Sequence, residues 1–462
     1  MLASRRLGLL STTLLMVACG DPSGSEATSN SDVAVDTNDE IGTSESATTN
    51  ATSESVGSSD STGDGDSSSA TTTSESDSSD GGTKFDSLIP DTPGMDNCLG
   101  QGGVDVEFSY IWISNTAEGT LTKLNTETLV EEGRFITRPD HQGRPSRTSV
   151  NLSGDVAVAS RDGGISKFAA RLEDCVDSNG MPGIQTSSGK GDVEAWDVEE
   201  CRLWHLPLVG PSLASRPVAW TAGTQDPGTC NWVDQKLWTS TSLLNTPGSM
   251  QVLRLNGETG EIEETIAAPN VDIGAWGAYG GAVDAEDNFW FSTHGSATPP
   301  TLSRVTFDDL VLSTWPVPNG VAPYGMTFDS KGYAWVAGYA GGVARFDPAS
   351  ETWAVVAATG LGMQADGEGR VWVGSYGGMG TGVLAIDVET LQVIDFIPIP
   401  ASVTKGVSID FYGYVWVVDM ANSAYKVDPE THLYDVYAGL NEAYTYSDMT
   451  GAGLKNVAFP PG

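Results

Sequence analysis

The stretch Gly332–Pro348, GYAWVAGYAGGVARFDP, contains a short apolar run with a tryptophan, a glycine-rich break, a second alternating run and an Asp-Pro stop. Such breaks mark turns, and the alternation is typical of strands. The core of the stretch recurs as SYIWIS, GDVAVAS, QKLWTS, DNFWFS, GYAWVA, GRVWVG and GYVWVV. One position of these copies holds, in order, Trp112, Ala157, Trp238, Trp290, Trp335, Trp372 and Trp416. Their usual spacing of about 45 residues is the period of a four-stranded propeller blade.

Three further strands flank the tryptophan strand of most copies. One precedes it and ends in a turn such as FDSKG, and two follow it, as in VARFDPAS and TWAVVAA. The first copy lacks the preceding strand, while Thr445–Phe459 is left over at the C-terminal end. A ring closed by this segment would leave no exposed sheet edge. We therefore predict an all-β, seven-bladed β-propeller over residues 84–462, closed by a C-terminal strand, with six or eight blades as the alternatives.

The second copy contains a long insertion between its third and fourth strands, bounded by Cys175 and Cys201. An export signal implies an oxidising compartment, where cysteines pair. Four cysteines other than Cys19 allow three connectivities. A Cys175–Cys201 bond would staple the insertion, and a Cys98–Cys230 bond would tie the segment before the first blade to the third copy.

The first 83 residues are predicted to be a leader and a tether. Residues 1–18 combine Arg5 and Arg6 with an apolar run too short to span a bilayer, as in a signal peptide. Residues 16–19, MVAC, resemble a bacterial lipobox, so we expect a lipid on Cys19; an ordinary secretory signal is the alternative. Residues 19–83 are rich in Ser, Thr and Asp, and are expected to be disordered. Gly20 after the cysteine favours an outer-membrane or cell-surface location in the bacterial envelope.

The charge excludes one class of partner. The whole chain carries −38, and about −26 of this lies on residues 84–462. A polyanion gains nothing from releasing the counterions of DNA or RNA, so we expect no nucleic-acid partner. The expected partners are the membrane, through Cys19, and an unidentified protein, peptide or glycan.

Three blade patterns resemble those of the virginiamycin B lyase (streptogramin lyase) family. They are APYGMTFDSKGYAWVAG, LGMQADGEGRVWVG and KGVSIDFYGYVWVVD. The resemblance implies a seven-bladed propeller and, in the enzymes of that family, elimination chemistry that uses histidine, nearby acids and magnesium. Only four histidines are present, and no pair of copies presents matching ones. His294 and His141 are weak catalytic candidates; His205 and His432 lie within or at the start of fourth strands.

The loops between second and third strands should share one face with the connectors between blades. Together they hold basic and aromatic residues that suit a ligand with carboxylates or sugar faces. The predicted ligand-binding residues are Arg138, Arg144, Arg147, Arg161, Trp276, Tyr279, Tyr324, Tyr339, Tyr376, Tyr444 and Tyr446. The alternative is that the arginines pair with acids such as Asp140 and Asp162 and that the aromatic rings pack between blades.

A second possible site is a metal loop. Asp174, Asp177 and Asn179 precede Gly180 in an arrangement similar to the start of a calcium loop. Cys175 and Thr186 depart from that pattern, and a disulfide-stapled loop is the alternative. No cofactor is certain, with calcium or magnesium as the possible ions.

Two functions from different classes fit these features. The first is a lipid-anchored recognition or scaffold module for a protein, peptide or glycan. The alternative is a lyase of the virginiamycin B lyase type, or a hydrolase, acting on a cyclic peptide or glycan at the same face. The sequence leaves open whether the protein is an enzyme.

Overall fold

The computed structural model describes residues 109–210 and 213–460. The predicted signal peptide, Cys19, the tether and Cys98 lie outside the described residues. All described residues belong to the unit Lys84–Gly462.

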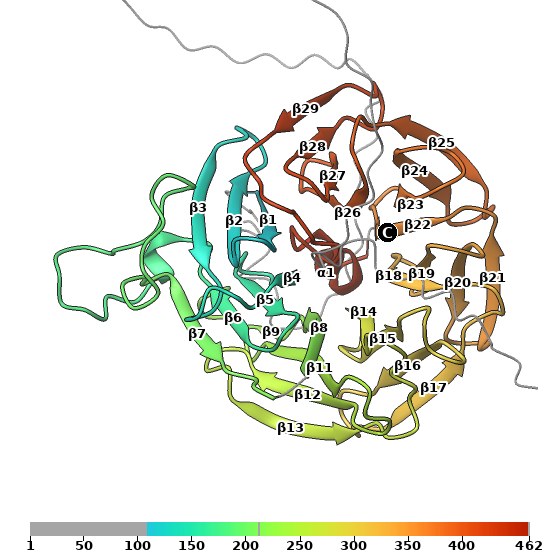
Figure 1. Cartoon of the computed structure of the whole chain (residues 1–462), viewed down its shortest axis with the longest axis horizontal. Coiled ribbons are helices and arrows are strands. Elements are labelled where there is room, and N and C mark those ends of the chain that lie inside the picture. The colour runs from blue at the N-terminus through green and yellow to red at the C-terminus, as the bar shows by residue number, and fades with distance from the viewer. Residues whose placement is uncertain (1–108, 211–212, 461–462) are drawn as a thin grey trace, which may run out of the picture. The chain divides into compact units, whose positions relative to one another are not determined.

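Seven antiparallel sheets surround a common axis as the blades of a propeller (Figure 1). Blade one holds β1 (Tyr110–Asn115), β2 (Thr120–Asn125) and β3 (Glu131–Ile136), and blade two holds β4 (Pro145–Val150), β5 (Val156–Ser160), β6 (Ile165–Phe168) and β7 (Arg202–Leu206). Blade three holds β8 (Leu213–Trp220), β11 (Lys236–Leu243), β12 (Gln251–Asn256) and β13 (Ile262–Ala267), with a small hairpin of β9 (Thr224–Gln225) and β10 (Trp232–Val233) beside it. Blade four holds β14 (Ala278–Val283), β15 (Phe289–Thr293), β16 (Thr301–Val305) and β17 (Leu312–Pro316). Blade five holds β18 (Pro323–Phe328), β19 (Ala334–Gly338), β20 (Val343–Asp347) and β21 (Thr352–Val356), and blade six holds β22 (Gly360–Ala365), β23 (Arg370–Ser375), β24 (Gly382–Asp387) and β25 (Val393–Pro398). Blade seven holds β26 (Thr404–Ile409), β27 (Val415–Asp419), β28 (Ala424–Val427) and β29 (Tyr434–Tyr437). The predicted seven blades are confirmed, and the alternatives of six and eight are wrong.

The repeated tryptophan lies on β1 in blade one and on the second strand of blades three to seven, and it is buried in all six copies. In blades four to seven, an aspartate at the turn before that strand accepts the indole N–H. Asp329, for example, accepts from Trp335 Nε1 at 2.7 Å through Oδ2, while its Oδ1 accepts the backbone N–H groups of Lys331 and Tyr333. The other three pairs are Asp284 with Trp290, Asp366 with Trp372 and Asp410 with Trp416. One carboxylate thus shapes the turn and satisfies the largest core side chain.

The ring closes differently from the prediction. Residues 443–449 lie beside β1 in the innermost position of blade one, but they form only an isolated bridge, Asn115 to Ala443, and scattered hydrogen bonds. Hydroxyl groups replace part of the ladder: Ser114 N donates to Thr445 Oγ1, and Ser447 Oγ bonds both backbone groups of Thr148 on β4. A regular closing strand was therefore the wrong expectation, although its position was right.

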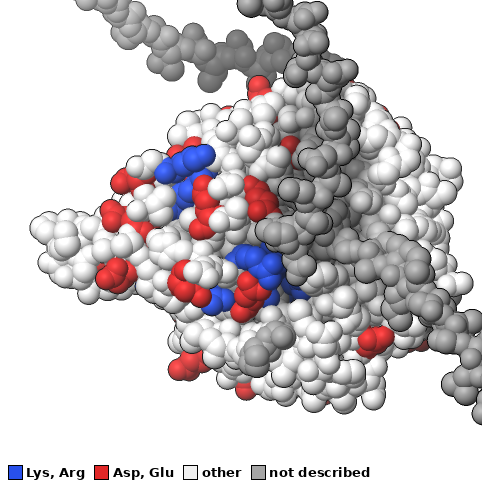
Figure 2. All heavy atoms as spheres, in the orientation of Figure 1, with Lys and Arg blue, Asp and Glu red and all other residues white. Residues whose placement is uncertain are grey.

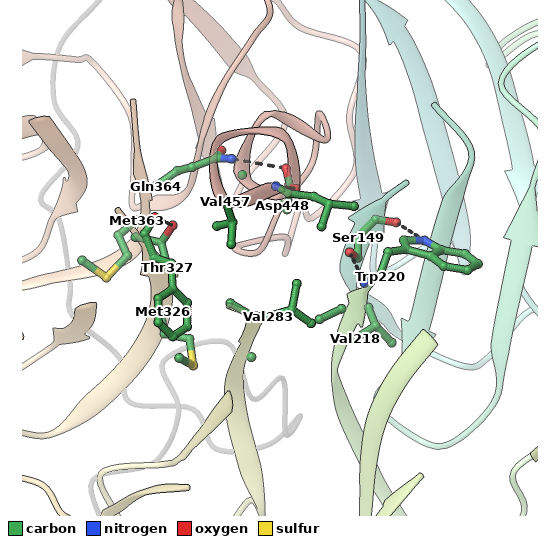
Figure 3. A pocket seen from close by; sticks show the side chains of 16 residues that line it. Ser149, Val218, Trp220, Val283, Met326, Thr327, Met363, Gln364, Asp448 and Val457 are labelled. Atoms are coloured by element: carbon green, nitrogen blue, oxygen red, sulfur yellow. Dashed lines mark hydrogen bonds between the residues drawn. The ribbon is translucent and has the colours of Figure 1, made fainter. Parts of the chain in front are cut away.

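The rest of the C-terminal segment forms helix α1 (Ala452–Ala458) instead of a strand. It lies at the centre of the ring (Figure 1), with Ala452, Leu454 and Val457 buried against the cores of three different groups of blades. Asn456 Nδ2 donates to Ala365 O at the end of β22, so α1 lies at the end of the axis where first strands finish. Beside it is a cavity of about 40 Å³ into which Val218, Met326 and Val457 project (Figure 3).

The insertion lies between β6 and β7, as predicted, and begins with the 3₁₀ turn η1 (Leu172–Asp174). Cys175 and Cys201 form a disulfide, which confirms the predicted staple. Cys230 is also disulfide-bonded. Its predicted partner, Cys98, lies outside the described residues.

Candidate functional site

The connectors between blades and the loops between second and third strands lie together on one face, called here the connector face. Backbone hydrogen bonds join them in blades two and four to seven. Tyr339 N donates to Ala322 O and Ala322 N to Ala340 O in blade five, and Met420 N donates to Val403 O in blade seven. The connector face is thus a rigid rim around the end of the axis opposite α1.

Near its start, the innermost strand of each blade from two to seven places one side chain toward the axis at this face. From blade two to blade seven these side chains are Arg147, Arg216, Tyr279, Tyr324, Leu361 and Lys405. Tyr444 and Tyr446 of the closing segment contribute from blade one, and Arg161 contributes from the turn after β5. We call these nine residues the axial cluster; all are buried.

Two tyrosine rings bring the cations of the cluster together. The guanidinium carbons of Arg147 and Arg216 both lie 5.0 Å from the centroid of the Tyr279 ring. Arg161 and Lys405 lie 4.6 and 4.3 Å from that of Tyr444.

The tyrosine hydroxyls link the cluster further. The Tyr444 hydroxyl is 2.9 Å from that of Tyr279 and 2.5 Å from that of Tyr324. Four cations from blades two, three and seven therefore surround one chain of three phenols.

The three arginines of the cluster form no ion pair with a carboxylate of the described chain. Arg147 donates to the carbonyls of Tyr279 and Ser146, and Arg216 donates to that of Trp276 at 2.6 Å. The Arg161 side chain makes no hydrogen bond at all with a described residue, and its Nε is buried. Nη2 of Arg147 and Nε of Arg216 are buried without acceptors as well.

The lack of paired carboxylates is accompanied by lowered pKa values of two of these arginines. Burial lowers the pKa of Arg147 to about 9; nearby tyrosines raise it, and Arg216 lowers it further. Burial also lowers the pKa of Arg161, with Arg216 and Arg144 adding to the decrease. Arg147 therefore still carries its charge at neutral pH, in a setting that favours an incoming anion.

The predicted ligand-binding residues divide into three groups. Arg147, Arg161, Tyr279, Tyr324, Tyr444 and Tyr446 are buried in the axial cluster. Trp276, Tyr339 and Tyr376 are half-buried and pack against it, so they form an aromatic rim. Arg138 pairs with Asp140 at 2.6 Å, and Arg144 binds Asp162 through two hydrogen bonds. For these last two arginines the structure shows the local pairing that was the alternative.

Surface charge on this part of the molecule is uneven. On the face shown in Figure 2, lysine and arginine side chains gather over blades one and two, on the left of the view, among aspartates and glutamates.

His294 lies against the axial cluster. Its ring is 4.6 Å from Tyr279 and stacks on Tyr339 at 5.5 Å. Its Nδ1 accepts the backbone N–H of Ser296 at 3.1 Å and lies 3.0 Å from the Ser296 hydroxyl.

The other histidines have different settings. His141 lies in the exposed turn before β4. Burial lowers the pKa of His205 to about 4, with Arg202 and Arg138 adding to the decrease, so this histidine on β7 is neutral. His432 pairs with Asp395 at 2.8 Å on the outer edge of blades six and seven.

The predicted metal loop is held together locally. Asp174 pairs with Arg171, Asp177 accepts Gly180 N and Asn179 accepts Met181 N. Within residues 109–210 and 213–460 no three His, Cys, Asp or Glu side chains converge as metal ligands. The structure thus does not bring Asp174, Asp177 and Asn179 together as a calcium site.

Sequence reasoning missed Arg216 and Lys405. Both occupy the position of Tyr324 in PYG: Lys405 stands in TKG and Arg216 in SRP. Aligning first strands on the residue before Gly or Pro would have found them.

Comparison with known proteins extends to the fold only. No protein-family model and no curated protein sequence matches the chain. The chain is similar to solved structures of virginiamycin B lyase from Staphylococcus aureus, one of them with 16% identity over 63% of this chain and 83% of that chain, at a TM-score of 0.45. A streptogramin B lyase has 16% identity over 67% and 86% of the two chains, at 0.48. AztD of Citrobacter koseri has 11% identity over 73% and 97%, at 0.46.

These structures include the virginiamycin B lyase whose family the blade patterns resemble. Among the described residues, no helix is both long and apolar enough to cross a membrane.

Proposed function

We propose that this protein is a lipid-anchored propeller of the bacterial cell envelope that recognises a protein, peptide or glycan at its connector face. One observation carries the proposal: the aromatic rim of Trp276, Tyr339 and Tyr376 borders a cluster of buried cations and phenols at the same end of the axis. Aromatic rings provide large contact areas at low entropic cost, and cations provide specificity. The backbone bonds of the connector face hold both in place before a ligand arrives.

Binding of the full-length protein to glycan and peptide arrays tests the proposal. Removing a rim side chain, as in Tyr339→Ala, is expected to weaken binding at least about tenfold, because central aromatic contacts commonly contribute more than 1 kcal/mol. Tyr412→Ala is the matched control, since Tyr412 is 53% exposed in the turn between β26 and β27, at the α1 end. Equal losses in the two variants, or a loss only in Tyr412→Ala, would place recognition elsewhere.

The anchoring part of the proposal has its own test. Incorporation of labelled palmitate by the chain in a bacterial host is expected for the wild type and is expected to disappear in Cys19→Ser. Labelling that persists in the variant would exclude Cys19 as the lipidation site.

A lyase or hydrolase acting on a cyclic peptide or glycan at the same face is the second proposal. The contact of His294 with Tyr279 and Tyr339 favours it, because an imidazole beside phenols can accept or donate a proton. Conversion of a bound array ligand by the wild type, lost in His294→Ala while binding persists, would establish an enzyme. Conversion unchanged in His294→Ala would remove this histidine from the chemistry.

A further inference from the structure

We propose that the axial cluster binds the carboxylate of the ligand, with Arg147, Arg161 and Arg216 as its recognition residues. This inference rests on the proposed recognition function and specifies the chemistry of its ligand. These three arginines come from separate segments of the chain, namely β4, the turn after β5, and β8. Their arrangement therefore depends on the folded ring.

The axial cluster brings three buried arginines together. Arg147 and Arg161 are 1% and 6% exposed, and Arg216 is 4% exposed. Taking a cation out of water costs several kcal/mol even after the protein relaxes. Like charges add to this cost, because nearby Arg216 lowers the pKa of both Arg147 and Arg161.

Aromatic rings and backbone carbonyls offset part of the cost of burying these arginines. Arg161 stacks on Tyr444, and Arg147 and Arg216 lie over Tyr279. A cation–π contact contributes about 0.5–2 kcal/mol, which is less than the loss of hydration. Backbone carbonyls accept only some of the N–H groups of Arg147 and Arg216. The rings and carbonyls leave a net demand for negative charge.

Each of the three arginines also has a guanidinium N–H group that lacks an acceptor among the described residues. Arg147 Nη2, Arg161 Nε and Arg216 Nε are buried N–H groups without an acceptor. Guanidinium groups bind carboxylates through paired, short hydrogen bonds. The surrounding tyrosine rings add a flat apolar wall, which fits a carboxylate joined to a sugar ring or to a peptide.

Two pairs of probes test the inference and separate these two sources. Glucuronate with glucose represents a sugar acid, and N-acetylglutamate with N-acetylglutamine represents an acidic peptide. Thermal unfolding of the full-length protein is measured with each probe at matched sodium concentration. We expect at least one carboxylate to raise the Tm of the wild type above the value with its neutral counterpart, and the responding pair names the source.

Variants then locate the effect. Arg161→Met removes a cation that has no hydrogen-bond partner among the described residues, and Arg144→Met removes a surface arginine paired with Asp162 as the control. The carboxylate-specific rise in Tm should be lost in Arg161→Met and kept in Arg144→Met. The Tm of Arg161→Met without probe reports its fold and should be equal to or above that of the wild type.

A carboxylate response that persists in Arg161→Met, or the lack of any carboxylate response in the wild type, overturns the inference. So does a lower Tm of Arg161→Met without probe, because it would mean that this guanidinium already has a partner. These results differ from failure of the proposed function. An array ligand that depends on Tyr339 but not on Arg161 would keep recognition and remove the carboxylate.

Discussion

At the residue scale, the aspartate before the tryptophan strand of blades four to seven has two tasks, carried out by its two oxygens. Blade two separates them, because Asn151 stands at the aspartate position and Ala157 at the tryptophan position. Asn151 Oδ1 still accepts the N–H groups of Ser153 and Asp155, while no indole requires the second oxygen. In blade two the turn bonds are thus kept without an indole bond, whereas in blades four to seven one carboxylate makes both.

Replacing such an aspartate should be costly. Asp329→Ala is expected to lower the free energy of unfolding by about 3 kcal/mol, because it strands the Trp335 indole N–H and two turn N–H groups. Asp347→Ala is the control: it removes a carboxylate that bonds two backbone N–H groups at the surface, and should cost about 1 kcal/mol. Urea unfolding of both variants measures the difference, and equal losses would contradict the role of the indole bond.

Asp287 provides a pH-dependent prediction. Burial raises its pKa to about 6, although the N–H groups of Ala222 and Gly223 oppose the rise, and Asp284 adds to it. A carboxyl whose folded pKa lies above its unfolded value favours folding when protonated. Its contribution should therefore fall as the pH increases from about 4 to above 6.

Asp287→Asn removes this titration and keeps an oxygen for Ala222 N, 2.8 Å from the carboxylate in the wild type. The stability of the wild type minus that of Asp287→Asn should decrease by about 1–3 kcal/mol between pH 4 and pH 7. Urea titrations at a series of pH values give this difference. A difference that stays constant or increases with pH would show that burial does not control this group.

At the element scale, hydroxyl groups close the ring where a strand was expected. Thr445→Val keeps the shape of the side chain but leaves the buried Ser114 N–H without its acceptor at 2.8 Å. The expected loss is about 1–3 kcal/mol. Thr431→Val is the control, since the Thr431 hydroxyl accepts Leu433 N in an exposed turn. Thermal unfolding compares the two, and a Thr445→Val protein as stable as the control would mean that the closing segment does not depend on this bond.

The insertion in blade two should behave as a separately stapled element. The Cys175–Cys201 bond spans 26 residues, and a loop of that length is stabilised by about 3–4 kcal/mol in the chain-entropy description. Because the insertion leaves the blade at Ala169 and returns at Cys201, opening it need not unfold the ring. The Cys175→Ser, Cys201→Ser double variant should be cleaved by protease between residues 171 and 200 while the blades resist. Simultaneous cleavage throughout the chain would instead make the insertion part of the core.

At the whole-molecule scale, charge opposes folding. The chain carries −38, and the arginines that could offset it are partly sequestered at the axis. Raising NaCl from about 0.05 to about 0.5 M shortens the screening length to about 4 Å and weakens the repulsion. The Tm should rise over this range. A Tm that falls would show that surface ion pairs outweigh the repulsion.

The period of the repeat was enough to predict the fold, because six of the seven copies repeat the tryptophan strand at nearly regular spacing. Two features of the structure could not be predicted from the repeat. The closing segment is held by the Thr445 and Ser447 hydroxyls, which give no strand pattern in the sequence. Its end forms α1, which packs into the end of the axis instead of extending a sheet. The face was predicted, but Arg216 and Lys405 join Arg147 only when separate blades meet in space.

The most direct measurement is a crystal structure of the full-length protein grown with N-acetylglutamate or glucuronate, whichever raises the Tm. The carboxylate should lie within hydrogen-bond distance of Arg147, Arg161 or Arg216, with the rest of the ligand toward Trp276, Tyr339 and Tyr376. A ligand bound elsewhere, or these three guanidiniums paired with carboxylates of the chain itself, would contradict recognition at the axial cluster.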